Sequence, residues 1–112
     1  MPPKANPLGL NKLQLKTLTI LQELARGGQV APDSDGSVRL TELPSPHGDH
    51  FHVGHGVVRA ADATGLSNEG VWRALERKGL ARSEYPLAVV VTAAGLAYET
   101  GLRHAILHGG GH

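Results

Sequence analysis

The sequence predicts a single α+β domain in which short strands lie between and after two amphipathic helices. Its 112 residues are the length of one domain. Two segments, at about 11–27 and 67–78, carry apolar residues at the 3.6-residue spacing of amphipathic helices. Short apolar runs bounded by Gly, Pro, Asp and Ser indicate strands between and after these helices. A mixture of helices and short strands along one chain favours the α+β class.

The first helix is predicted to begin at Asn11 and to end at Gly27. Asn11 and Gln14 have the spacing of a capping box, and Leu10 and Leu15 that of a hydrophobic staple. The apolar residues share one broad face: Leu13, Leu18, Ile20, Leu21, Leu24 and Ala25. The opposite face carries Lys12, Lys16, Thr19 and Glu23.

Residues 28–56 form a segment rich in Gly, Pro, Asp and His, for which we expect an inserted β-hairpin. Its strands are predicted at 38–43 and near 51–53, joined by a turn at 44–48. A short second helix is expected at about 57–63.

The run from Gly65 to Leu80 predicts a turn, a short amphipathic helix and a defined helix end. We expect Ser67 to be the N-cap, with Glu69 placed favourably for the helix dipole. Gly79 can adopt the left-handed conformation that ends a helix. Val71, Ala74 and Leu75 fall on one side of this helix, and the opposite side carries Glu69, Arg73, Glu76 and Arg77.

Two apolar runs at 80–82 and 87–91 follow, and they predict a small hairpin across 83–86. Thr92 is expected to cap a last helix that runs to about Leu107. The domain is thus predicted over 11–108, with a flexible arm at 1–10 and a disordered tail at 109–112.

Composition narrows the functional classes. The absence of cysteine excludes a disulfide framework and a thiolate site, and no apolar stretch is long enough to cross a bilayer, so we expect a cytoplasmic protein. The formal net charge is only +1, but residues 57–82 hold five cations against three anions. No nucleophile or Gly-rich phosphate loop accompanies the candidate acid–base residues Asp49, His50 and His52, so an enzyme is not expected.

Three pieces of the chain resemble one known family. They are ATGLSNEGVWRAL at 63–75, LERKGLAR at 75–82 and VTAAGLAYE at 91–99. In this order they resemble winged helix-turn-helix proteins, in particular transcription regulators of the MarR and PadR kind. The resemblance implies a three-helix core, a small β-hairpin wing and a C-terminal helix, to which this chain adds the hairpin inserted between the first two helices. The helix at 67–78 is about one turn shorter than the usual recognition helix, and the wing turn at 83–86 contains an acid.

The function that this resemblance implies is sequence-specific binding of duplex DNA by a transcription regulator, with the helix at about 67–78 as the recognition helix. Asn68 has the groups to pair with adenine and Arg73 those to pair with guanine. The remaining candidate DNA contacts are Ser67, Glu69, Arg77, Arg82 and Arg59. Ser67, Arg77 and Arg82 are expected to contact phosphates, and Arg59 is expected to lie in one positive stripe with the other arginines. We expect a homodimer, because the first and last helices offer more apolar surface than one domain of this size covers.

Two alternatives use other residues. One is a protein–protein interaction module of the same fold that does not bind DNA, with the inserted segment or Trp72 as its contact surface. The other is a metal- or pH-responsive regulator, in which zinc or nickel is held by clustered histidines at His47, His50, His52 and His55. His104 and His108 have the i, i+4 spacing of a second chelating pair on the predicted last helix. No other cofactor is expected.

Overall fold

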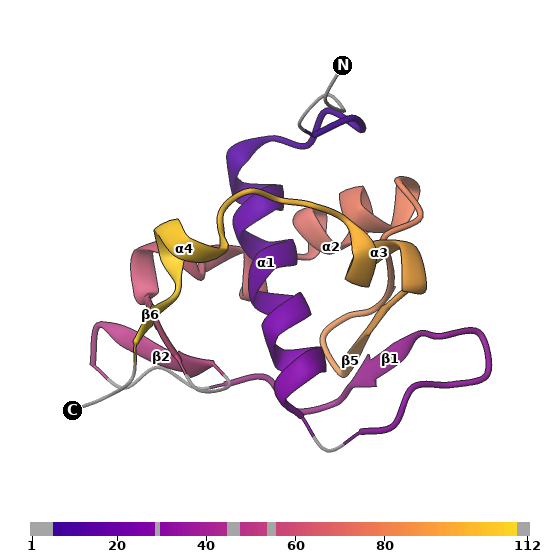
Figure 1. The fold of residues 1–112 in the computed structure, drawn as a ribbon, viewed down its shortest axis with the longest axis horizontal. Helices are drawn as coiled ribbons and strands as arrows, with labels where there is room; N and C mark the ends of the chain where they lie inside the picture. Colours follow the sequence, from indigo (N-terminus) through magenta and orange to yellow (C-terminus); the bar gives the residue numbers. More distant parts are fainter. Residues whose placement is uncertain (1–5, 29, 45–47, 54–55, 110–112) are drawn as a thin grey trace.

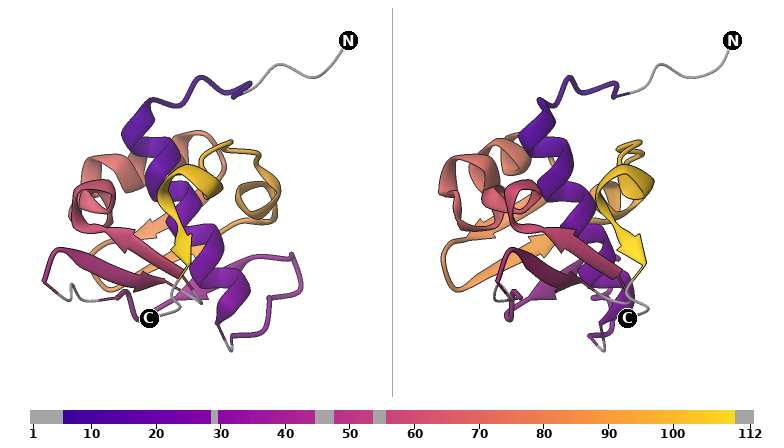
Figure 2. Two further views of the ribbon diagram at one scale, coloured as in Figure 1. Left: turned by 60° about the vertical axis from the view of Figure 1, so that its left-hand side comes forward. Right: turned by 90° about the vertical axis from the view of Figure 1, so that its left-hand side faces the viewer.

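The fold is organised around one long helix, α1 (Lys12–Gly27), in a computed structural model that describes residues 6–28, 30–44, 48–53 and 56–109. The helix lies between two three-stranded antiparallel sheets, β1–β5–β4 and β2–β3–β6 (Figure 1). The turned views in Figure 2 show α1 passing between these sheets. Together with the shorter helices, this arrangement confirms the α+β class.

Helix α1 begins as predicted, because Asn11 and Gln14 form a complete capping box. Asn11 Oδ1 accepts a hydrogen bond from Gln14 N at 2.8 Å, and Gln14 Oε1 accepts one from Asn11 N at 3.0 Å. Thr19, expected on the solvent face, is buried, as is Thr17. The prediction of a single buried face is wrong, since the chain packs against this helix on more than one side.

The first sheet contains β1 (Val38–Leu40), β5 (Ala88–Val91) and β4 (Ala81–Glu84). The predicted hairpin β4–β5 is confirmed, with Arg82 opposite Val90. The predicted pairing of 38–43 with 51–53 is wrong, because β1 pairs with β5 instead. All four residues of β5 are apolar and buried, which suits a central strand with a partner on each side.

The second sheet contains β2 (His50–Val53), β3 (Gly56–Arg59) and β6 (His108–Gly109). The helix predicted at 57–63 is therefore wrong over its first half. Val57 and Val58 are β-branched and favour a strand. Only two 3₁₀ turns follow, η1 (Ala60–Asp62) and η2 (Thr64–Ser67).

Helix α2 (Glu69–Arg77) follows η2 and ends as predicted. Gly79 has a φ of 76°, and Leu80 N donates to the carbonyl of Leu75 at 3.0 Å, which is the bond expected of a left-handed helix end. Leu80 is buried directly afterwards, so the chain turns from α2 straight into β4.

The predicted last helix is broken into α3 (Ala93–Ala97) and α4 (Arg103–Ile106). Thr92 caps α3 as predicted, with its Oγ1 accepting from Gly95 N at 3.0 Å. The helix stops because Gln22 Nε2, from α1, donates to the carbonyls of Gly95 and Tyr98 at 2.8 and 2.7 Å and so satisfies groups at the C-terminal end of α3. Gly101 then adopts a φ of 72° before α4 begins.

Residues 6–10, within the predicted arm, are attached to the domain. The Tyr98 hydroxyl donates to Asn6 Oδ1 at 2.6 Å and accepts from Leu8 N at 3.1 Å, and Leu10 is buried. Within the described residues, no helix combines the length and the apolar character needed to cross a membrane.

Candidate nucleic-acid interface

Asn68, and not Ser67, caps helix α2. Asn68 Oδ1 accepts a hydrogen bond from Val71 N at 3.4 Å, while Ser67 Oγ points back to the carbonyl of Thr64 at 3.4 Å. The prediction of Ser67 as the cap is wrong because η2 extends through it and leaves residue 68 in the extended conformation that an N-cap requires. The backbone carbonyl of Asn68 thus starts the helix. Because the side-chain Oδ1 is used by the cap, the side-chain Nδ2 of Asn68 is the group that can donate to a base edge.

The two sides of α2 are separated as predicted. The side facing the core buries Val71, Trp72, Ala74 and Leu75. The solvent side exposes Ser67, Asn68, Glu69, Arg73, Glu76, Arg77 and Lys78. Trp72 is 1% exposed and belongs to the core, so it is no contact surface for a partner.

The β4–β5 hairpin is fixed to the start of α2 through Tyr85. The Tyr85 hydroxyl donates to the carbonyl of Ser67 at 2.9 Å, and its ring meets that of Trp72 edge to face at 4.7 Å between centroids. Trp72 Nε1 in turn donates to the carbonyl of Gly65 at 3.2 Å. The hairpin tip exposes Leu87, whose accessible fraction is 78%. Helix and hairpin therefore present one rigid outer surface.

Arg73 is paired within its own helix. Its Nη2 and Nε atoms lie 2.7 and 2.9 Å from Glu69 Oε2, one turn earlier. This hydrogen-bonded carboxylate raises the pKa of Arg73. Both side chains are exposed, so the pair is of the kind that contributes about 0–1 kcal/mol and exchanges readily for another partner.

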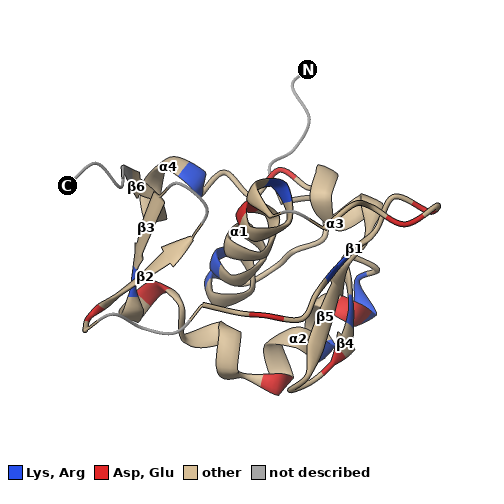
Figure 3. Ribbon diagram, turned by 90° about the horizontal axis from the view of Figure 1, so that it is seen from below, with Lys and Arg blue, Asp and Glu red and all other residues tan. Residues whose placement is uncertain are grey.

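Arginines of the first sheet are also paired with carboxylates. Figure 3 shows the ribbon coloured by charge, with basic and acidic positions close together around β4. Arg39 Nη2 lies 2.7 Å from Glu84 Oε1, and this hydrogen bond lowers the pKa of Glu84. Arg82 Nη2 lies 3.6 Å from Asp35 Oδ2 and donates to Ser37 Oγ at 3.2 Å. Hydrogen bonds from Ser37, and then the charge of Arg82, lower the pKa of Asp35.

Arg59 was expected to lie in one positive stripe with the arginines of α2, but it does not belong to their surface. It lies at the end of β3, in the other sheet, and its Nε is 3.8 Å from Asp62 Oδ2. Asp62 also pairs with Lys16 Nζ at 2.7 Å and is mostly buried. The pairing of Arg59 with this carboxylate connects β3 to η1 and α1.

Arg77 and Lys78, at the last turn of α2, form no ion pair with any residue that the structure describes. Both are exposed. Lys78 is not among the candidate contacts of the sequence analysis, although its position next to Arg77 and beyond Glu76, the last acid of the helix, was visible in the sequence. These two cations can contact a phosphate without breaking an ion pair to any described residue.

A shallow polar cleft of about 230 Å³ separates the solvent side of α2 from β4. Its lining consists of Glu69, Arg73, Glu76, Ser83, Glu84 and Tyr85. Three carboxylates against one guanidinium disfavour a phosphate inside this cleft. A polyanion would therefore contact the rim of the surface, at the start and the end of α2.

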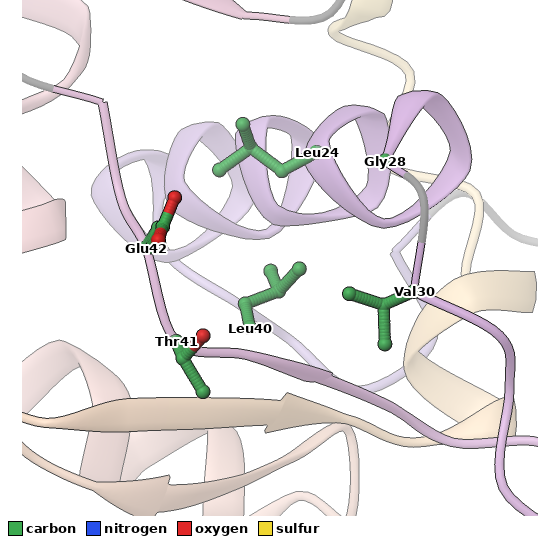
Figure 4. Close-up of a pocket in the computed structure, with 6 residues that line it drawn as sticks. All are labelled: Leu24, Gly28, Val30, Leu40, Thr41 and Glu42. Atoms are coloured by element: carbon green, nitrogen blue, oxygen red, sulfur yellow. The ribbon is translucent and has the colours of Figure 1, made fainter.

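A second, more apolar pocket of about 400 Å³ lies between the C-terminal end of α1 and the chain that continues β1 (Figure 4). Leu24, Val30 and Leu40 supply apolar walls, and Thr41 and Glu42 supply polar groups at the side. Gly28 completes the lining. Five of its six lining residues belong to the segment 28–56, and none belongs to α2.

The predicted histidine cluster is only partly within the described residues. His47 and His55 lie outside them. His50 and His52 are neighbours on β2, with ring centroids 5.1 Å apart, and Asp49 Oδ1 lies 3.3 Å from His50 Nδ1. Among described residues, no group of three or more His, Asp or Glu side chains converges as a metal site. The spacing expected of His104 and His108 is not realised on one helix, because α4 ends at Ile106.

Comparison with protein-family models, curated proteins and solved structures finds no match to this chain.

Proposed function

We propose that the chain is a winged helix-turn-helix domain that binds duplex DNA through the exposed side of α2 and acts as a transcription regulator in the cytoplasm. The proposal rests on the order of the helices and strands along the chain and on the position of the β4–β5 hairpin beside α2. Helix α1, strands β1, β2 and β3, two 3₁₀ turns, the exposed side of α2 and the hairpin β4–β5 follow one another. Tyr85 of the hairpin contacts Ser67 and Trp72, which places the hairpin beside α2. The last turn of α2 carries Arg77 and Lys78, which form no ion pair within the described part of the chain.

Base recognition falls to the start and middle of α2. Asn68 Nδ2 is available to donate to a base edge, and Arg73 can reach a guanine once it leaves Glu69. That exchange is favourable, because an exposed ion pair contributes about 0–1 kcal/mol and a bidentate arginine–guanine contact discriminates by about 1–3 kcal/mol. Glu69 remains near Arg73, and its negative charge disfavours a phosphate contact by that arginine.

Phosphate contact falls chiefly to Arg77 and Lys78. Arg82 is held by Asp35 and Ser37, so its contribution depends on breaking those contacts. A further contact comes from the peptide groups at the start of α2, where the helix dipole favours an anion. The proposal needs no catalytic group.

Fluorescence anisotropy with a labelled duplex over a salt series tests this proposal. The wild type is compared with a double variant, Arg77→Gln and Lys78→Gln. Each lost phosphate contact reduces the magnitude of the slope of log K against log salt by about 0.9, so the double variant should lose about 2 from the slope. The matched control, Lys12→Gln with Arg103→Gln, removes the same charge from α1 and α4.

The proposal predicts that the control keeps the slope of the wild type. Equal slopes for all three proteins would show that charge on α2 is irrelevant. No binding to any duplex at low salt would remove DNA as the ligand.

Pairing of two copies belongs to the proposal, since a two-fold dimer matches paired half-sites on DNA. The helices expected to supply the contact are largely occupied within the domain, because α1 lies between two sheets and Ile106 of α4 is buried. Sedimentation velocity at increasing protein concentration, with and without duplex, tests whether two copies assemble.

A protein–protein interaction module is the second candidate, and two observations favour it. Most cations around α2 and β4 are already paired with carboxylates. The pocket formed by Leu24, Val30 and Leu40 and the exposed Leu87 offer apolar contact instead. This candidate predicts that Val30→Asp, at the exposed wall of the pocket, abolishes partner binding while the salt-dependent anisotropy signal is absent from the wild type.

A further inference from the structure

The outward face of the second sheet brings two imidazoles together on an edge strand. In β2, Val53 is fully buried and Phe51 is partly buried against the core. Alternate residues of a strand point to opposite faces, so His50 and His52 share the outer face. His52 is exposed and His50 is half-buried, so solvent reaches this pair.

The separation of the two rings fits a shared metal ion. Zinc binds imidazole nitrogen at about 2.0–2.1 Å in tetrahedral geometry, which places the centroids of two bound rings about 5 Å apart. The centroids of His50 and His52 are 5.1 Å apart, with an angle of 79° between the ring planes. This edge-to-face contact brings the two rings to a centroid spacing that a shared metal ion can bridge.

Asp49 gives His50 the hydrogen-bond partner that metal-binding histidines usually have. Its Oδ1 lies 3.3 Å from His50 Nδ1. When Nδ1 donates to this carboxylate, the lone pair that can bind a metal is on Nε2. Such a carboxylate fixes the tautomer and makes the ring a better ligand. Asp49 acts here as a positioning residue.

We propose that His50 and His52 bind a divalent transition metal of the zinc class, with Asp49 orienting His50. Imidazole suits zinc, nickel and copper(II), whereas magnesium and calcium prefer oxygen ligands. The described residues supply two protein ligands, and water fills the other coordination positions. This site is independent of the DNA contact proposed for α2.

Isothermal titration of the full chain, without an affinity tag, with zinc chloride tests the site. The expected result is saturable binding that the variant His50→Gln with His52→Gln weakens at least tenfold. Asp49→Asn should weaken it about tenfold without changing the stoichiometry, because a lost positioning carboxylate typically costs 10–100-fold in metal affinity. The matched control, His104→Gln with His108→Gln, should bind as the wild type does.

A second readout places the metal on the rings themselves. Zinc should shift the ring-nitrogen NMR signals of His50 and His52 in the wild type, and thermal melting in chelator should show that all variants are folded. Unsaturable binding, or equal affinity of the wild type and the His50–His52 variant, would overturn the proposal. Shifts confined to His104 and His108 would overturn it as well.

Discussion

Gly65 controls the approach of the turn η2 to helix α1, and its replacement tests the packing that positions α2. Built on the backbone at Gly65, a Cβ atom would lie 1.8 Å from Thr17 Oγ1 and 3.1 Å from Thr17 Cβ. Ordinary contacts do not fall below 3.0 Å, so the two segments must move apart by more than about 1 Å. Rotation of Thr17 away from this contact breaks the 2.8 Å bond from Oγ1 to the carbonyl of Leu13.

We expect Gly65→Ala to reduce the free energy of unfolding by about 2–3 kcal/mol, the usual cost of overpacking a core. Thr17→Ala alone should cost about 1–2 kcal/mol, because it removes a buried methyl group and a hydrogen-bonded hydroxyl. In the double variant the closest clash is gone, so its cost should be at least 1 kcal/mol below the sum of the single costs.

Urea unfolding followed by Trp72 fluorescence measures all four proteins. Trp72 is a suitable probe, since its Nε1 donates to the carbonyl of Gly65 itself. Strict additivity of the two substitutions, or a Gly65→Ala protein as stable as the wild type, would refute the packing of η2 against α1.

Three further predictions concern the start of α2 and the neighbouring sheet. Asn68→Ala should cost about 1 kcal/mol of stability in urea unfolding, while Ser67→Ala should cost much less, because Asn68 is the cap; equal losses would contradict this assignment. Tyr85→Phe should lower the free energy of unfolding by about 1 kcal/mol through loss of the hydroxyl bond to Ser67, and a thermal melt unchanged from the wild type would show that this bond contributes nothing. Arg39 lowers the pKa of Glu84 below its ordinary value of 4.5, so their pairing stabilises the fold above pH 4.5 and stops doing so as the pH falls through the lowered pKa. The difference in urea midpoint between the wild type and Arg39→Gln should therefore be present at pH 7 and vanish in acid, and a difference that grows in acid would contradict this sign.

The start of α1, the end of α2 and the start of α3 were predictable because their signals are local. Asn11 and Gln14 satisfy each other's backbone amides across three residues. Thr92 Oγ1 accepts a hydrogen bond from Gly95 N over the same separation. Gly79 needs only its own φ and the following Leu80. Such contacts involve neighbours in the sequence, so residue type and spacing contain the required information.

Strand partners and helix breaks were less predictable, because their causes are distant in the sequence. β1 pairs with β5, about 50 residues later, and nothing in residues 38–43 excludes the nearer partner. The break after α3 depends on Gln22, a polar residue of α1 that reaches the carbonyls of Gly95 and Tyr98. The helix expected at 57–63 was a different error, since Val57 and Val58 already favoured a strand.

The candidate site also combines features set by local sequence with features set by distant contacts. The exposure of Arg73 and Arg77 was predictable from helical spacing. The pairing of Arg82 with Asp35 was not, because it depends on the loop before β1 meeting β4. Sequence reasoning therefore identified the exposed cations of α2, while the structure was needed to separate those with internal partners from Arg77 and Lys78.

The most direct test of DNA binding by α2 is a ¹H–¹⁵N NMR titration of the labelled chain with a short duplex at low salt. The proposal predicts saturable shifts in the backbone amides of residues 67–78 and in the side chains of Asn68 and Arg73, with the amides of β2 and β3 unchanged. Shifts confined to β2 and β3, or no shifts at all, would contradict it.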